Sequence, residues 1–208
     1  MQYDKKEIDA LDRVMRLKII NSVTGIKPGN LIGTINKSKN TNLAVFSSII
    51  HLGSNPSLLG FISRPTTDDV GHTLNNIIQT GYYTINHIHS EFVKKAHYTS
   101  VKFPSNVSEF SACQLSEEYI NGFKAPFVKE STFKIGMRFK EVIDIKANGT
   151  VLVIGEIEQL IFPDNAFVDG DIDLEASGGV GISGLNTYYA LKKIESYPYA
   201  KLNEIPQF

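Results

Sequence analysis

The sequence has very little cysteine, because Cys113 is the only one among 208 residues. A lone cysteine cannot form a disulfide within the chain, so the fold must be stable without one. Such scarcity is typical of proteins in a reducing compartment and argues against a secreted disulfide scaffold. We therefore expect a cytoplasmic protein held together by an apolar core, which 42% hydrophobic residues can supply.

Long apolar segments are also missing. Polar residues interrupt every hydrophobic stretch well before the roughly 18 residues that a membrane-spanning helix needs. Residues 1–12 are dotted with charges and lack the apolar centre of a signal peptide. The sequence therefore predicts neither a targeting segment nor a membrane span.

Neither sign of charge predominates. Lys and Arg number 21 against 22 Asp and Glu, which leaves a net charge of −1, and no long run of one sign occurs. Proteins whose main partner is nucleic acid rely on a basic stripe along the phosphate backbone. The balance disfavours nucleic acid but leaves open a small anionic ligand, which needs only a few donors.

Hydrophobic periodicity predicts short helices and strands. Apolar residues recur at helical spacing over residues 9–24, and Gly25 follows as a stop signal. Further short helices are expected over 73–80 and 90–98, whereas 99–126 shows no assignable pattern. Runs rich in branched and aromatic residues predict strands over 31–36, 43–50, 58–64 and 82–86. The first three are expected to be consecutive antiparallel strands.

The clearest extended pattern lies at 132–162, where two runs flank Asn148-Gly149. Both residues tolerate positive φ, so the pattern is typical of a long β-hairpin. The glycine cluster at 178–184 is interpreted as a loop, followed by a helical turn or two within 185–193. Six or more strands with several short helices, and no repeat or linker, favour one closed antiparallel barrel decorated by helices.

Three other chemistries fit the sequence poorly. His87 and His89 would share a strand face, but nothing fixes a third ligand for a metal ion. No Gly-x-Ser-x-Gly motif supports a nucleophile. Gly179, Gly181 and Gly184 match the dinucleotide fingerprint formally, but only 24 residues follow, too few for the βαβ unit that it needs.

Polar residues on and after the first strands could hold a phosphate. They are Asn42, Ser47, Ser48, Ser63, Arg64, His72 and Thr73. Hydroxyls and backbone N–H groups at a helix start aim donors at an anion, and Arg64 adds a planar charged group. On residue types alone an alternative stays open, in which Thr73 only caps its helix and Arg64 is simply solvated.

Several short motifs follow one another in a characteristic order. They are Gly33-Thr34, Asn42 to Ser48, Arg64-Pro65, His72 to Ile77, Thr80 to Asn86, Ser108 to Phe110 and Ala125 to Ser131. Their order resembles the flavin reductase-like family of FMN-binding split barrels. The resemblance covers about residues 19–190.

The resemblance implies a mainly β fold with flanking helices, a six-stranded antiparallel Greek-key split barrel that forms a homodimer. It implies a single FMN-binding domain over 1–208, with a helical segment at 1–24, the barrel at 25–190 and a tail at 191–208. The residues that it places around the flavin ring and ribityl chain are Asn42, Phe46, Ser47 and Ser48, with Asn86 beside the ring. Those that it places at the FMN phosphate are Ser63, Arg64, His72 and Thr73.

The function implied is an NAD(P)H:flavin reductase that transfers hydride between nicotinamide and flavin. FMN would be either bound or a substrate, and NADH or NADPH would be the electron donor. Since the cofactor supplies this chemistry, no residue is assigned as catalytic acid or base. Two alternatives remain open, because one fold can serve several functions: a non-enzymatic, flavoredoxin-like electron carrier, or a split barrel for another small cofactor such as pyridoxal phosphate or haem.

Overall fold

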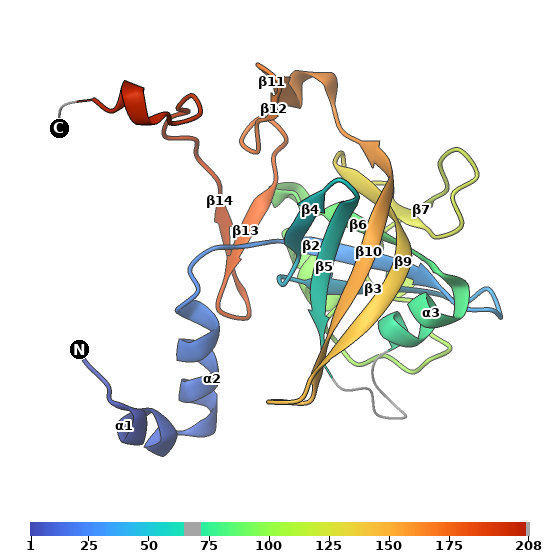
Figure 1. The fold of residues 1–208 in the computed structure, drawn as a ribbon. Coiled ribbons are helices and arrows are strands. Elements are labelled where there is room, and N and C mark those ends of the chain that lie inside the picture. The colour runs from blue at the N-terminus through green and yellow to red at the C-terminus, as the bar shows by residue number, and fades with distance from the viewer. Residues whose placement is uncertain (65–71, 207–208) are drawn as a thin grey trace.

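The computed structural model describes residues 1–64 and 72–206 (Figure 1). Two helices come first, α1 (Lys5–Ala10) and α2 (Arg13–Ser22), where one helix over 9–24 was predicted. The single-helix prediction is wrong because Asp12 caps α2: its carboxylate accepts hydrogen bonds from the backbone N–H groups of Val14 and Met15. None of the described helices is both long and apolar enough to cross a membrane.

The main sheet is antiparallel, and its strands run in the order β3-β2-β6-β9-β10-β5-β4. Their bounds are β2 Asn30–Ile35, β3 Thr41–Phe46, β4 Ile50–Ser54, β5 Ser57–Ser63, β6 Tyr82–His87, β9 Lys134–Ile145 and β10 Thr150–Ile161. The class predicted, mainly β with flanking helices, is confirmed, but this sheet has seven strands rather than six. The additional strand is β4, because the predicted strand 43–50 ends at Phe46 and the chain resumes at Ile50 against β5.

The long hairpin is confirmed. Strands β9 and β10 pair from Ile145↔Thr150 to Lys134↔Ile161, with two irregularities of register. The turn occupies residues 146–149, and of the Asn148-Gly149 pair only Gly149 adopts a positive φ, of 72°. Glycine is therefore the residue that this turn requires.

A second sheet of three strands forms near the C-terminus, where the prediction was wrong. The glycine cluster contributes strand β13 (Val180–Ser183) and the expected helical turn is strand β14 (Thr187–Ala190), paired with β1 (Lys27–Pro28) in the order β1-β13-β14. The backbone N–H of Val180 donates to the carbonyl of Ile88 at 3.0 Å. These partners are distant in the sequence, so the local glycine content gave no sign of a strand.

The remaining elements are short. The predicted helices 73–80 and 90–98 are confirmed as α3 (His72–Thr80) and as a 3-10 turn (Ser90–Phe92) that leads into α4 (Val93–Tyr98). The stretch 99–126 contains α5 (Glu109–Ala112) and β7 (Glu117–Glu118). Other elements are β8 Phe127–Val128, β11 Phe167–Val168, β12 Asp171–Ile172 and the 3-10 turns Asp164–Ala166 and Leu202–Glu204.

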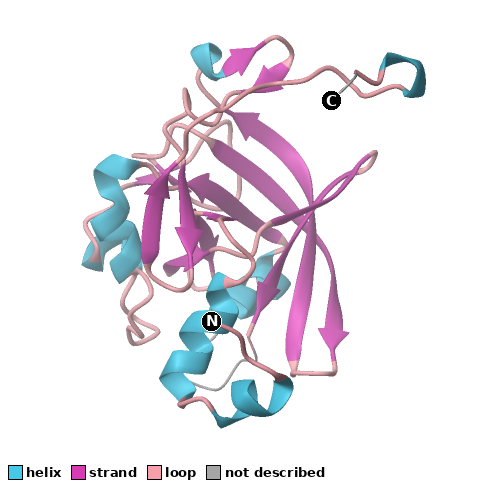
Figure 2. Cartoon of the chain, turned by 90° about the vertical axis from the view of Figure 1, so that its left-hand side faces the viewer, coloured by secondary structure: helices cyan, strands magenta, loops and turns pink. Residues whose placement is uncertain are grey.

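Two apolar clusters lie on opposite faces of β2, and the helices lie around the outside of the strands (Figure 2). Ile32 belongs to the cluster inside the barrel, where Phe61, Tyr83 and Met137 are also fully buried. Leu31, the next residue along β2, belongs to the outer cluster with residues of α4 and α5. Side chains alternate between the faces of a strand, so both faces of β2 are buried.

Candidate functional site

Two of the predicted site residues meet where α3 begins. Asn42 of β3 and Thr73 of α3 are 7% and 6% exposed, and the Asn42 Nδ2 donates to the Thr73 Oγ1 at 3.0 Å. One turn later, Asn76 Nδ2 donates to the Thr34 Oγ1 of β2 at 3.0 Å. These two buried bonds hold the first turns of α3 against the sheet.

The next two predicted residues follow β3. The hydroxyl of Ser48 accepts from the backbone N–H of Ile62 at 3.1 Å and donates to the carbonyl of the same residue at 3.2 Å. Ser48 thereby joins the segment after β3 to the end of β5. Ser47 is half-buried, and its hydroxyl makes no hydrogen bond among the described residues. Of the two, Ser47 is the one whose hydroxyl can reach a ligand without breaking a bond within the protein.

Phe46, at the end of β3, packs inward. Its ring meets that of Phe61 edge to face, with centroids 5.0 Å apart, and Phe61 in turn meets Tyr83 at 5.8 Å. Such edge-to-face pairs stabilise a core beyond the area that they bury. Phe46 is half-buried and therefore forms part of the barrel wall just before Ser47.

The other predicted residues flank residues 65–71. Ser63 ends β5 and is 6% exposed, and Arg64 follows it as an exposed side chain. His72 and Thr73 open α3 on the other side. Pro65, which belongs to one of the sequence motifs, lies outside the described residues. Hydroxyl, guanidinium and helix N-terminal groups thus lie at both ends of this short segment.

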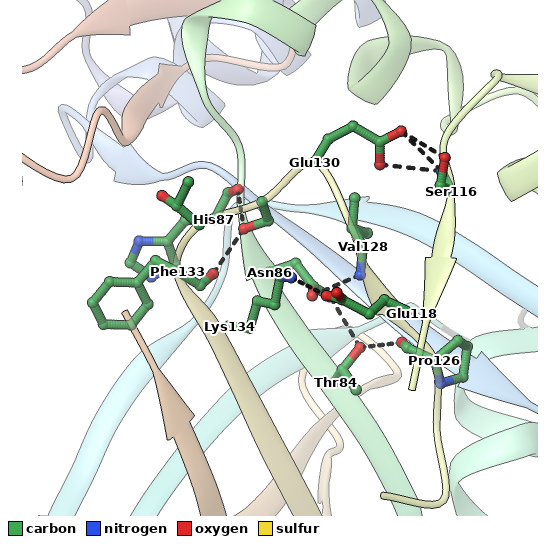
Figure 3. Close-up of polar contacts among 12 residues, drawn as sticks. Thr84, Asn86, His87, Ser116, Glu118, Pro126, Val128, Glu130, Phe133 and Lys134 are labelled. Atoms are coloured by element: carbon green, nitrogen blue, oxygen red, sulfur yellow. Dashed lines mark hydrogen bonds and ion pairs between the residues drawn. The ribbon is translucent and has the colours of Figure 1, made fainter. Parts of the chain in front are cut away.

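Asn86 has a different environment, inside the wall of the barrel (Figure 3). Its Nδ2 donates to the carbonyl of Leu31 at 3.2 Å and to the Thr84 Oγ1 at 2.9 Å, and its Oδ1 accepts from the backbone N–H of Val128 at 3.0 Å. Among the described residues, no hydrogen bond links it to the other predicted site residues. The amide of Asn86 holds β2, β6 and β8 together.

Sequence reasoning missed Glu109, which lies beside Asn42. Its Oε2 accepts from the backbone N–H of Leu43 at 2.9 Å, and the residue is 6% exposed. Burial raises the pKa of this carboxyl, although the bond from Leu43 and the charge of His72 act in the opposite direction. The signal in the sequence was the motif Ser108 to Phe110, in which Ser108 caps the short helix α5 and Glu109 was given no role.

Two cavities are lined by other residues than the predicted site residues. One, of about 760 Å³, has walls of exposed loop residues that include Lys37, Lys39 and Lys124. The other, of about 280 Å³, is lined by Asn30 and His87. Over residues 1–64 and 72–206, no three His, Cys, Asp or Glu side chains are placed to hold a metal ion.

Comparison with known proteins supports the resemblance seen in the sequence. Residues 26–172 match the family model described as the flavin reductase like domain. The structure resembles that of a candidate flavin reductase with a split barrel domain from Shewanella frigidimarina, with a TM-score of 0.92 and 47% identity. The match covers 96% of this chain and 100% of that one.

More distant solved structures share the fold. Component B of nitrilotriacetate monooxygenase from Bacillus cereus has a TM-score of 0.82 at 16% identity, over 95% of this chain and 98% of that one. Flavoredoxin of Desulfovibrio vulgaris has a TM-score of 0.73 at 21% identity, over 85% and 92%. The family model and the Shewanella structure together cover the barrel and nearly the whole chain, and the protein belongs to the flavin reductase-like family of split barrels.

Proposed function

We propose that the protein is an FMN-binding oxidoreductase, an NAD(P)H:flavin reductase that transfers hydride between NADH or NADPH and the flavin. The family supports a flavin as cofactor or substrate. The observation that carries the choice of FMN is the pair of donor groups that flank residues 65–71. Arg64 lies at one end, and Thr73, held by Asn42, lies at the other.

The donors fit a phosphate group. Arg64 is exposed and makes no ion pair with the described residues, so its guanidinium can face an anion. Thr73 accepts a hydrogen bond from Asn42, which leaves its own hydroxyl hydrogen free to donate. The N-terminus of α3, a helix of nine residues, adds backbone N–H groups and the positive end of the helix dipole. With Ser63 and His72, these groups form the proposed phosphate site.

The ring and ribityl chain are assigned to the segment after β3. Ser47 would donate its free hydroxyl to the flavin, whereas Phe46 would support the ring as part of the barrel wall. Ser48 and Asn42 would line the ribityl chain. Their hydrogen bonds within the protein hold both side chains in place. Asn86 would act by positioning, because its amide holds the strands beside the ring.

A bound flavin would accept the hydride itself, so the protein needs only to orient the two rings and exclude water. We further propose that the chain is a single FMN-binding domain, works in the cytoplasm and forms a homodimer. The dimer is supported by exposed apolar side chains along α2, where Val14, Leu17 and Ile20 are 56%, 44% and 46% exposed.

The phosphate assignment is tested by comparing FMN with riboflavin, which lacks the phosphate. Titration of flavin fluorescence should show tighter binding of FMN to the wild-type protein. Arg64→Ala combined with Thr73→Ala should weaken FMN binding by about 10- to 100-fold and leave riboflavin nearly unchanged. Lys146→Ala, in the β9–β10 turn, is the matched control. If the double variant keeps the wild-type preference for FMN, the phosphate assignment is wrong.

An electron carrier is the second candidate, favoured by the similarity of the fold to flavoredoxin of Desulfovibrio vulgaris. A reductase should oxidise NADH or NADPH continuously when free FMN is supplied. A carrier should retain flavin through gel filtration and show negligible turnover. A protein that gains no flavin absorbance with FMN would instead support a split barrel for another small cofactor.

A further inference from the structure

The cavity of about 760 Å³ lies where β2 turns into β3 and where α3 ends. Its walls come mainly from the turn between β2 and β3, from Gln79 and Thr80 at the end of α3, and from the segment 117–124. Sites for small organic molecules have volumes of about 300 to 1,000 Å³. The proposed phosphate site is at the other end of α3, about 12 Å along the helix. The cavity is therefore a second place where a small molecule can bind.

Positive charge predominates in the lining of this cavity. Three lysines, Lys37, Lys39 and Lys124, accompany one acidic residue, Glu117. Lys37 and Lys39 lie in the turn between β2 and β3, are exposed and make no ion pair with the described residues. A recess whose walls carry mainly one sign of charge concentrates ions of the opposite sign. The cavity therefore favours an anion over a neutral molecule or a cation.

Lys124 is held in place at the cavity wall. Its Nζ lies 4.4 Å from the centroid of the Tyr82 ring and donates to the Tyr82 hydroxyl at 3.2 Å. A cation over an aromatic ring is attracted to the face of that ring. An ammonium group has three donors, so two remain for a ligand. Because Lys124 is already positioned, it loses less conformational freedom on binding an anion than a solvated lysine does.

The carboxylate of Glu117 is engaged within the protein. One of its oxygens accepts from the Thr41 hydroxyl at 2.6 Å, and the other accepts from the Tyr119 hydroxyl at 3.3 Å. Burial, together with the charge of Glu117, raises the pKa of Tyr119 to about 12. The phenol is therefore neutral at physiological pH and adds no negative charge. The three lysines keep their excess over the single carboxylate.

Two aromatic side chains give the cavity an apolar wall. Phe123 is 7% exposed and packs against the rings of Tyr82 and Phe127, with centroids 5.8 and 5.3 Å away. Tyr119 is 50% exposed, so a large part of its ring is open to a ligand. Aromatic side chains pack favourably against other rings, either stacked or edge to face. The wall therefore suits a ligand whose body is a planar ring system.

The segment that carries Tyr119 and Lys124 is fixed to the barrel near both of its ends. Glu118 forms an ion pair with the ammonium of Lys134 in β9 (Figure 3). The Pro126 carbonyl accepts from the buried Thr84 hydroxyl at 2.6 Å. A wall held in this way exists before a ligand arrives, so binding does not have to order it.

We propose that this cavity binds a small organic anion, a planar ring system that bears carboxylate or phosphate groups. Lys37, Lys39 and Lys124 are its charged contacts, and Tyr119 is its ring contact. Carboxylate and phosphate share the charged oxygen acceptors that ammonium groups bind. The site uses none of the residues assigned to FMN, so it does not depend on the proposed function.

The test is calorimetric titration of the full chain with four probes. Two are ring dianions, 1-naphthyl phosphate and naphthalene-2,3-dicarboxylate. The other two are naphthalene-2,3-dicarboxamide, which has the ring without the charge, and inorganic phosphate, which has the charge without the ring. At least one ring dianion should bind about 10-fold or more tightly than both of these controls. Binding of only one dianion identifies phosphate or carboxylate as the group recognised. If neither dianion binds more tightly than both controls, the proposal is overturned.

The charged contacts are tested with Lys37→Gln combined with Lys39→Gln. Affinity for the dianion that binds should fall by about 10-fold, while the melting temperature stays unchanged because neither ammonium has an ion-pair partner among the described residues. The matched control is Lys94→Gln combined with Lys102→Gln, which removes the same charge from two exposed lysines outside the cavity. Equal affinity in the two double variants would overturn the proposal.

The FMN phosphate site is the other place where 1-naphthyl phosphate can bind. Arg64→Ala combined with Thr73→Ala should leave the affinity for the ring dianions unchanged, because both residues lie outside the cavity. If this variant loses dianion binding, the probe occupies the FMN phosphate site and the proposal for the cavity is overturned. The preference for FMN over riboflavin is measured separately, so failure of one proposal can be told from failure of the other.

The ring contact is tested by two substitutions of Tyr119. Tyr119→Phe keeps the ring and should keep the affinity for the ring dianion, whereas Tyr119→Ala removes the ring and should lower it by about 10-fold. Affinity for inorganic phosphate should be the same in both variants. If Tyr119→Phe and Tyr119→Ala bind the ring dianion equally, Tyr119 is not its contact and the assigned position is wrong.

Discussion

The amide of Asn42 donates a hydrogen bond to the hydroxyl of Thr73 at 3.0 Å, across 31 residues of sequence. This bond joins β3 to the start of α3, so it holds the helix N-terminus that we assign to the FMN phosphate. Both side chains are buried, and water cannot easily replace either partner. The position of the helix and the affinity for flavin should therefore be linked.

A double-mutant cycle with Asn42→Leu and Thr73→Val tests this link. Each single variant leaves one buried polar group unpaired, so each should lose about 1–3 kcal/mol of unfolding free energy. The double variant leaves no unpaired group and should lose less than the sum of the two. Urea denaturation measures all three, and strictly additive losses would show that the bond contributes nothing to stability.

The neighbouring serines should respond differently to the same substitution. Ser48→Ala removes a hydroxyl that bonds both backbone groups of Ile62, so unfolding free energy should fall by about 1–2 kcal/mol. Ser47→Ala removes a hydroxyl with no described protein partner, so stability should hardly change while flavin affinity falls. Thermal denaturation and flavin titration of both variants check the contrast. If Ser47→Ala lost more stability than Ser48→Ala, the assignment of Ser48 as the structural serine and Ser47 as the flavin contact would be reversed.

Asn86 should be among the most sensitive positions in the barrel. Asn86→Ala leaves the Leu31 carbonyl, the Val128 N–H and the Thr84 hydroxyl each without its bond to the amide. With several buried groups affected and a cavity created, a loss of about 3–4 kcal/mol is expected. Chemical denaturation measures it. Wild-type stability together with weak flavin binding would mean that Asn86 contacts the ligand and is not a structural residue.

His87 should make stability depend on pH in mildly acidic solution. Because burial, with a smaller contribution from the charge of His89, lowers its folded pKa to about 4, below the unfolded value of 6.5, the unfolded chain takes up the proton first as pH falls. The contribution is complete above pH 6.5 and declines toward pH 4, by at most about 3 kcal/mol. His87→Gln should flatten this part of the unfolding curve, whereas His51→Gln, at an exposed position in β4, should not. Identical slopes in wild type and His87→Gln would refute the prediction.

Local patterns determined much of the fold. Asn148-Gly149 predicts its hairpin because the turn needs one residue at positive φ, and Gly149 supplies it. Helix α3 is predictable because its apolar residues recur at helical spacing and a glycine follows it. The order of the short motifs identified the family, which the match over residues 26–172 confirms. The roles predicted for individual site residues remain predictions.

The error in the C-terminal sheet arises because its partners are far apart in the sequence. Strand β13 exists because β1 and Ile88 offer it backbone partners, whereas β4 pairs with β5, the next strand along the chain. A glycine-rich segment has low intrinsic strand preference, so only these distant partners make it a strand. No local pattern could distinguish the segment of β13 from a loop.

The lone cysteine, the balanced charge and the hairpin can be read from the sequence itself, and the ordered motifs resemble the flavin reductase-like family of split barrels, which the family match confirms. Only the tertiary structure decided which polar groups are satisfied. It pairs Asn42 with Thr73 and surrounds Asn86 with partners, but leaves the amide of Asn30 without a hydrogen bond to any of the described residues. The physical reason is that the availability of a side chain for a ligand depends on every group around it, and those groups come from strands dozens of residues apart.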